Sequence, residues 1–109
     1  MITRTAIFEG RIKPGKENYF FAEVSARLVP LWLRFPHESN VSWWRCLHAD
    51  EGAPLIAMIQ HIDYPDEAAM TEALASAVRT EARAITQELL QLFEGRLYHV
   101  VSECREIAS

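Results

Sequence analysis

Histidines with nearby carboxylates are the residues of this chain that could transfer protons at neutral pH. His61 lies near the end of an apolar segment, and Asp63 follows two residues later. Residues two apart on a strand point to the same side, so Asp63 could orient His61 as a general base. The alternative is structural, with His61 packed at a strand end and Asp63 capping the next helix. His99 alternates with Val101 and Glu103, which allows a similar pair and has the same alternative.

Most other catalytic signatures are missing from the sequence. No two histidines have HxH, HxxH or HExxH spacing, so we expect no zinc or other metal site. GxGxxG, GxxxxGK[ST] and GxSxG are also absent, and we expect no cofactor. A single histidine is enough to bind haem, so that class stays open. Cys46 and Cys104 lack CxxC spacing and are expected to be reduced thiols.

Two adjacent tryptophans, Trp43 and Trp44, place one indole on each face of a predicted strand. An indole that lines a pocket favours flat, apolar, aromatic ligands, although both rings could simply be packing residues. The pocket wall could be formed by either of two alternating sets, Ser42/Trp44/Cys46/His48 or Val41/Trp43/Arg45/Leu47. We prefer the first set because it carries more polar groups. The predicted ligand-binding residues are Arg4, Trp44, His48 and Tyr98.

The length of 109 residues predicts a single domain, residues 1–109. A net charge of −4 with scattered basic residues argues against a nucleic-acid partner. No apolar run reaches the roughly 20 residues of a membrane span, and the N-terminus lacks the apolar segment of a signal peptide. We therefore expect a cytoplasmic protein with no membrane partner.

The central element is predicted to be a strand over Ala53–Ile62, the longest apolar run, between Gly52 and Pro65. A short apolar run between turn signals is typical of a strand that is buried on both faces in the middle of a sheet. The other predicted strands are Thr3–Ile12, Val41–Ala49 and Arg96–Cys104.

The first predicted helix follows Lys16 and carries an apolar stripe at spacings of three and four. Pro30 should end or kink it near Leu28, because proline removes a backbone donor. The connector Leu31–Pro36 is hydrophobic, which indicates that it is covered by another element.

The second apolar stripe spans Asp66–Phe93, which is too long for one helix in a domain of this size. Asp63 or Asp66 could cap its start. We expect a break near Ser76–Thr80, where serine and threonine can cap a new helix, and a helix end at Gly95.

This order of strand, helix, strand, strand, helix, strand predicts an α+β, ferredoxin-like βαββαβ fold with a four-stranded sheet. Right-handed crossovers are expected to place the first and third strands side by side and parallel. Both helices then cover one face of the sheet. Because the strands are apolar on both faces, we expect a second copy of the chain to cover the other face in a homodimer.

Three segments resemble the dimeric α/β-barrel superfamily, and within it most nearly the EthD-like branch: Arg11–Lys16 (RIKPGK), Met70–Arg79 (MTEALASAVR) and Leu92–Gly95 (LFEG). The resemblance implies a four-stranded antiparallel sheet, a barrel formed by two such sheets, and a pocket in each sheet-and-helix half. Members of the superfamily include cofactor-free monooxygenases, isomerases, polyketide cyclases and haem-binding proteins.

The expected function is therefore binding of an apolar or aromatic small molecule by a homodimer. If the protein is an enzyme, we expect proton transfer or cofactor-free oxygenation with His61 as the base and Asp63 orienting it. The alternatives are a non-catalytic binding or accessory protein that uses the same pocket, and a structural dimer with a filled core.

Overall fold

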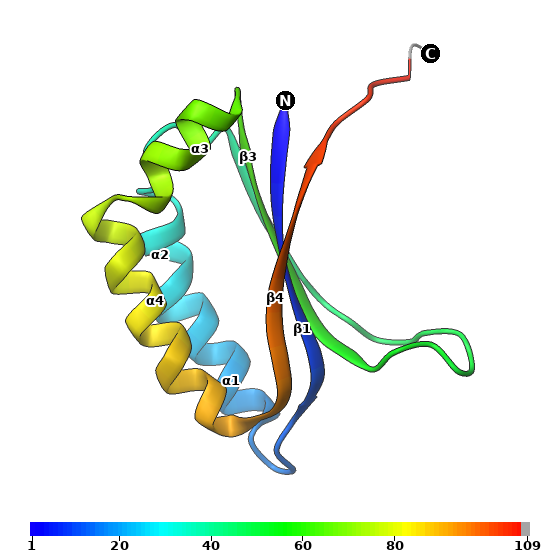
Figure 1. Cartoon of the computed structure of the whole chain (residues 1–109). Helices are drawn as coiled ribbons and strands as arrows, with labels where there is room; N and C mark the ends of the chain where they lie inside the picture. Colours follow the sequence, from blue (N-terminus) through cyan, green and yellow to red (C-terminus); the bar gives the residue numbers. More distant parts are fainter. Residues whose placement is uncertain (108–109) are drawn as a thin grey trace.

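A computed structural model describes residues 1–107 of the chain and has one four-stranded antiparallel sheet. Its strands are β1 (Ile2–Ile12), β2 (Asn40–Arg45), β3 (Ile56–Tyr64) and β4 (Phe93–Glu103), in the spatial order β2-β3-β1-β4. All the helices lie against one face of this sheet, and the opposite face is uncovered (Figure 1). We call these the closed face and the open face. The predicted ferredoxin-like order of elements is confirmed.

The pairing of β1 with β3 corrects one prediction. The two strands are neighbours, as expected, but they run antiparallel, with Ala6 opposite Gln60. A crossover makes the strands that it joins parallel, and here the helical segment joins β1 to β2. β3 lies between those two strands, and it reverses direction after the hairpin that follows β2. β1 and β3 are therefore adjacent and antiparallel.

The first helical region changes type near its proline. It consists of α1 (Glu17–Glu23), a π-helical segment (Val24–Leu28) and α2 (Val29–Trp32). The N–H of Val29 donates to the carbonyl of Val24, five residues earlier, and Pro30 follows within the first turn of α2. The widened turn lets the helix continue past a residue that has no N–H donor. The expected irregularity near Leu28 is confirmed, although the helix extends to Trp32.

The connector after this region is covered, as its hydrophobicity indicated. Leu31, Trp32 and Phe35 are buried, whereas Leu33 and Arg34 between them are exposed. The buried side chains belong to the core between the helices and the sheet.

The second helical region is divided into α3 (Glu67–Leu74) and α4 (Ala77–Leu89), as predicted. Asp66 caps α3 by accepting from the N–H of Ala69 at 2.8 Å, and Ser76 caps α4 by accepting from the N–H of Arg79 at 3.3 Å. No helix within residues 1–107 is long and apolar enough to cross a membrane.

The prediction that Gly95 ends this helix is wrong. A 3-10 turn (Leu90–Leu92) leads directly into β4, and Gly95 pairs with Gly10 inside the sheet. Both glycines have positive φ angles, 150° and 137°. A Cβ on Gly95 would lie 2.1 Å from the carbonyl oxygen of Glu9, so only glycine permits this approach.

The strands on either side of the β2–β3 hairpin are shorter than predicted. β2 ends at Arg45 and β3 begins at Ile56, leaving residues 46–55 outside the two strands. We call residues 46–55 the hairpin arm. The arm projects away from the helices, on the side of the open face (Figure 1). It contains a turn at Gly52 with a φ angle of 84° and a proline that cannot donate to a strand partner.

β3 is central in the sheet, but it is buried on only one face within a single chain. Met58, Gln60, Ile62 and Tyr64 are buried beneath the helices, whereas Ala57, Ile59, His61 and Asp63 are partly exposed on the open face. The prediction of burial on both faces is therefore wrong for the chain alone. The sequence pattern does not distinguish a strand face that helices of the same chain bury from one that a second chain would bury.

Candidate functional site

A cavity of about 370 Å³ lies between the closed face and the helical layer. A cavity of this size falls within the range typical of small-molecule sites. The strands contribute one wall, which consists of Arg4, Ala6, Phe8, Gln60, Ile62, Tyr64, Leu97 and His99. The helices, the 3-10 turn and the connector contribute the other, which consists of Trp32, Phe35, Arg79, Ala82, Arg83, Thr86, Gln87 and Leu90.

The sheet register explains how distant segments meet at this wall. Ala6 on β1 lies opposite Gln60 on one side and opposite His99 on the other. These three residues therefore form one row across the sheet, beneath the helices. Because alanine has the smallest side chain of the three, the surface of the sheet has a depression at Ala6. Ala82, on α4, is the corresponding small residue of the helical wall. Small side chains on both walls leave the space that a ligand needs.

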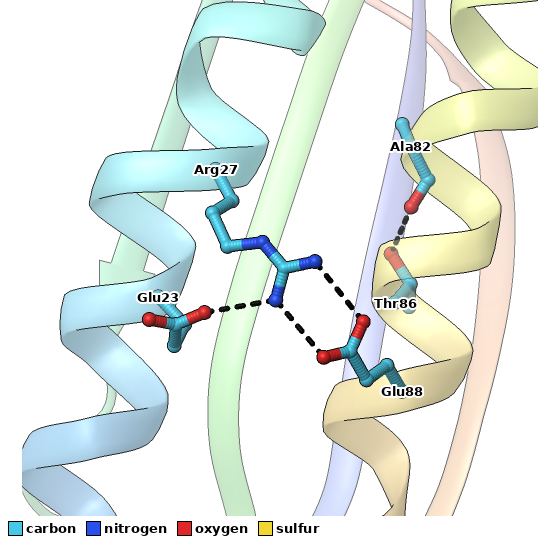
Figure 2. Close-up of polar contacts among 5 residues, drawn as sticks. All are labelled: Glu23, Arg27, Ala82, Thr86 and Glu88. Carbon is cyan, nitrogen blue, oxygen red and sulfur yellow. Dashed lines mark hydrogen bonds and ion pairs between the residues drawn. The ribbon is translucent and has the colours of Figure 1, made fainter.

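α4 presents one flank to the cavity and the other to the first helical region. Ala82 and Thr86 line the cavity, and the hydroxyl of Thr86 donates to the carbonyl of Ala82 at 2.9 Å (Figure 2). On the other flank, Glu88 accepts two hydrogen bonds of 3.0 Å from Arg27, which also donates to Glu23 at 2.9 Å (Figure 2). The two carboxylates raise the pKa of Arg27 above its ordinary value, and Arg27 lowers the pKa of Glu88. This bridge ties α4 to the π-helical segment.

The cavity is electropositive. Desolvation lowers the pKa of Arg4, and the neighbouring charge of Arg79 lowers it further. Desolvation, with Arg4 and Arg79, also lowers the pKa of His99 to about 4. Desolvation raises the pKa of Tyr64, against the opposing effect of Arg4. At neutral pH the cavity therefore contains a neutral imidazole, a protonated phenol and charged guanidinium groups.

The predicted catalytic pair lies on the opposite side of the sheet from this cavity. The ring of His61 packs edge-on against Trp44, with the ring centroids 4.7 Å apart. Asp63 accepts from the hydroxyl of Thr3 at 2.6 Å and from the amide of Asn40 at 3.4 Å. The same amide nitrogen lies 3.5 Å from Nε2 of His61. Asn40 therefore lies between the two residues, and the role of the pair stays a prediction.

The predicted ligand-binding residues are divided among three regions. Arg4 lines the cavity, Trp44 and Tyr98 lie on the open face, and His48 is an exposed residue of the hairpin arm. The hydroxyl of Tyr98 donates to Glu9 at 3.3 Å. The structure does not bring these four residues together, and their binding roles are not tested.

The tryptophan pair is arranged as expected, with one indole on each face. Trp43 faces the helices and stacks on Phe21 at a centroid distance of 6.0 Å, whereas Trp44 faces the open side. Neither of the two β2 sets considered as a pocket wall lines the cavity. β2 is an edge strand, and the cavity lies beneath β3, β1 and β4.

Sequence reasoning missed most of the cavity residues, above all Gln60, Tyr64 and Arg79. The sequence shows that Gln60 and Tyr64 alternate with the open-face residues along their strand. Both alternating sets contain apolar side chains, so the pattern does not indicate which set borders a cavity. A usable signal was present on the second helix, where Arg79 and Arg83 share a face with Ala82 and Thr86 at helical spacing. Within residues 1–107, no three His, Cys, Asp or Glu side chains are grouped as metal ligands.

Comparison with known proteins identifies the fold. No family model and no curated protein sequence matches the chain. An EthD-family (ethyl tert-butyl ether d) protein from Bacillus halodurans aligns with a TM-score of 0.74 and 16% identity, covering 96% of this chain and 99% of that one. A monooxygenase from Streptomyces coelicolor, in complex with nanaomycin D, aligns with a TM-score of 0.68 and 11% identity, covering 99% and 90%.

A third structure, a dimeric ferredoxin-like protein of unknown function from Thermobifida fusca, aligns with a TM-score of 0.66 and 14% identity, covering 94% of this chain and 90% of that one. The chain shares its ferredoxin-like fold with these three proteins. At these identities the likeness establishes the fold alone. The function has to be argued from the cavity and from the open face.

Proposed function

We propose that this protein binds a flat, apolar small molecule in the cavity beneath its helices. The observation that carries the proposal is the cavity itself, about 370 Å³ of space between the sheet and the helices that is partly open to solvent. A cavity of this size, with apolar walls and a few polar groups, is typical of a small-molecule site. The aromatic rings of Phe8, Trp32 and Phe35 border it and suit a planar ligand.

The test is to fill the cavity from α4. Ala82→Phe puts an aromatic ring where the two walls approach, and we expect it to abolish binding of aromatic probes such as 1-naphthoate. Ala84→Phe is the matched control, because Ala84 is an exposed residue of the same helix. Calorimetric titration of both variants measures the effect. Equal binding by the two variants would contradict the proposal, provided that their melting curves show both to be folded.

The proposed assembly is a homodimer whose two open faces meet. The open face exposes large apolar side chains, with Trp44 47% exposed and Val100 45% exposed. Leu47 and Leu55 on the hairpin arm are 76% and 62% exposed. Apolar surface gathered on one side of a small protein is typical of an interaction surface. A second copy would cover one sheet with the other and would leave both cavities intact.

A second candidate function is cofactor-free oxygenation of the bound molecule. It is favoured by the position of His99 beside arginines that could stabilise an anion in the cavity, and by a monooxygenase among the structures with this fold. His99 would accept a proton from an acidic carbon of the ligand, and the resulting anion would react with O2. Oxidation of a CH2 group to a carbonyl consumes one O2 and releases one water. Oxygen uptake with anthrone-like substrates is the test.

A further inference from the structure

Three arginines border the cavity, and no carboxylate does. Arg4 comes from β1, whereas Arg79 and Arg83 lie one turn apart on α4. The chain carries 15 acidic residues and a net charge of −4, so acidic side chains are not scarce. None of them is among the residues that line this space. The positive charge is therefore concentrated locally in an acidic protein.

These arginines also have no ion-pair partner in the part of the chain that the structure describes. The cationic residues that form ion pairs within residues 1–107 are Arg11, Arg27, His37, Arg96 and Arg105. Arg4 is partly buried, and a guanidinium group taken from water without a counter-charge is destabilised. An anion placed near Arg4 would offset that cost.

The neutral polar groups of the cavity are consistent with an anionic ligand. Gln60 is 7% exposed as a residue and lines the cavity, and its side-chain amide is not sealed among other atoms, since no buried side-chain polar atom within residues 1–107 lacks a partner. The phenol of Tyr64 keeps its proton, because burial raises its pKa. Both groups can donate to an oxygen atom of a ligand, and donation to an ionised oxygen gives the stronger bond.

We propose that the cavity selects organic anions, namely a flat apolar body that carries one ionised oxygen group beside Arg4 and Arg79. The group can be a carboxylate or the oxygen of a phenolate or enolate, which share this chemistry. The aromatic lining holds the body, and the arginines hold the charge. The inference rests on the proposed function, since it requires the cavity to bind a ligand.

The test compares two isosteric probes, 1-naphthoate and the neutral 1-naphthamide, by calorimetric titration of the full chain. We expect the carboxylate to bind at least about tenfold more tightly than the amide. Arg4→Gln and Arg79→Gln should each remove most of this preference. Arg11→Gln is the matched control on β1, since Arg11 lies outside the cavity and pairs with Glu94. It should keep the preference.

A second probe distinguishes the two kinds of anion. 4-Nitro-1-naphthol is coloured when ionised, so absorbance at fixed pH reports whether the cavity ionises a bound phenol. An increase in the ionised fraction assigns the site to phenolates as well as carboxylates, and no increase restricts it to carboxylates. Equal binding of 1-naphthoate and 1-naphthamide would overturn the inference and leave the proposed function standing. Failure of every probe to bind would overturn both.

Discussion

The two faces of the sheet carry similar residue types but differ in what covers them. On the closed face, the row Gln60, Ala6 and His99 lies beneath α4 and borders a cavity. On the open face, His61 and Asp63 lie beside Trp44 and Asn40 with nothing from their own chain above them. Each face has a histidine, so residue type alone does not identify the site. The difference is that the closed face, in the part of the chain that the structure describes, combines a histidine with a cavity and with arginines that form no ion pair.

We propose that ligands bind at the closed face and that self-association uses the open face. The largest effect is expected for self-association, from a substitution at the centre of the open face. Ile59→Lys places a charge there, and we expect the dimer dissociation constant to rise at least about 100-fold. Leu33→Lys is the control, because Leu33 is exposed on the helical side of the molecule. Sedimentation velocity at micromolar concentration measures both, and a persistent Ile59→Lys dimer would refute the assignment.

The next effect separates the two histidines. If the protein oxygenates its ligand, His99→Ala should lower the rate of oxygen uptake by about 100-fold or more, the usual contribution of a general base. His61→Ala should leave the rate nearly unchanged if it retains the dimer. The opposite result would support the pair His61 and Asp63 predicted from sequence, and would move the chemistry to the open face.

The smallest effect is on the pH dependence of stability. The pKa of His99 is about 4 in the folded chain and about 6.5 when the chain is unfolded. Between these values the unfolded chain binds the extra proton, so stability is lost as pH falls from about 6.5 towards 4. Because the side chain of His99 is itself exposed, solvent weakens this effect, and His99→Gln should reduce the decrease in melting temperature between pH 7.5 and pH 5 by about 2–4 °C. An unchanged decrease would show that the pKa of His99 is not lowered by desolvation and by the neighbouring arginines.

Much of the fold could be predicted from the sequence because its signals are local. Asp66 and Ser76 both cap helices as expected. The apolar stripe over 66–93 is divided into two helices at Ser76, which caps the second one. Pro30 correctly marked an irregular helix. Gly95 misled the prediction because a glycine after a helix commonly ends it, whereas this one is needed for a close strand pairing with Gly10.

The site could not be predicted in the same way because it depends on which face of each strand the helices cover. His61 and His99 are both flanked by apolar residues in alternation, and the sequence does not distinguish a helix from a second chain as cover. Arg4, which lines the cavity, was predicted to contact a ligand, but Arg79 was not, since its place at the cavity depends on α4 lying over β1 and β4. The alternation of side chains along each strand predicts which residues share a face, but it does not predict which face borders a ligand.

Ligand binding beneath α4 is tested by a crystal structure of the protein with 1-naphthoate. We expect the naphthalene ring between Trp32 and Ala82, with its carboxylate beside Arg4 and Arg79. We also expect a second copy of the chain to cover Trp44 and His61 on the open face. Naphthoate bound against Trp44 and His61, with none in the cavity beneath α4, would contradict binding at the closed face.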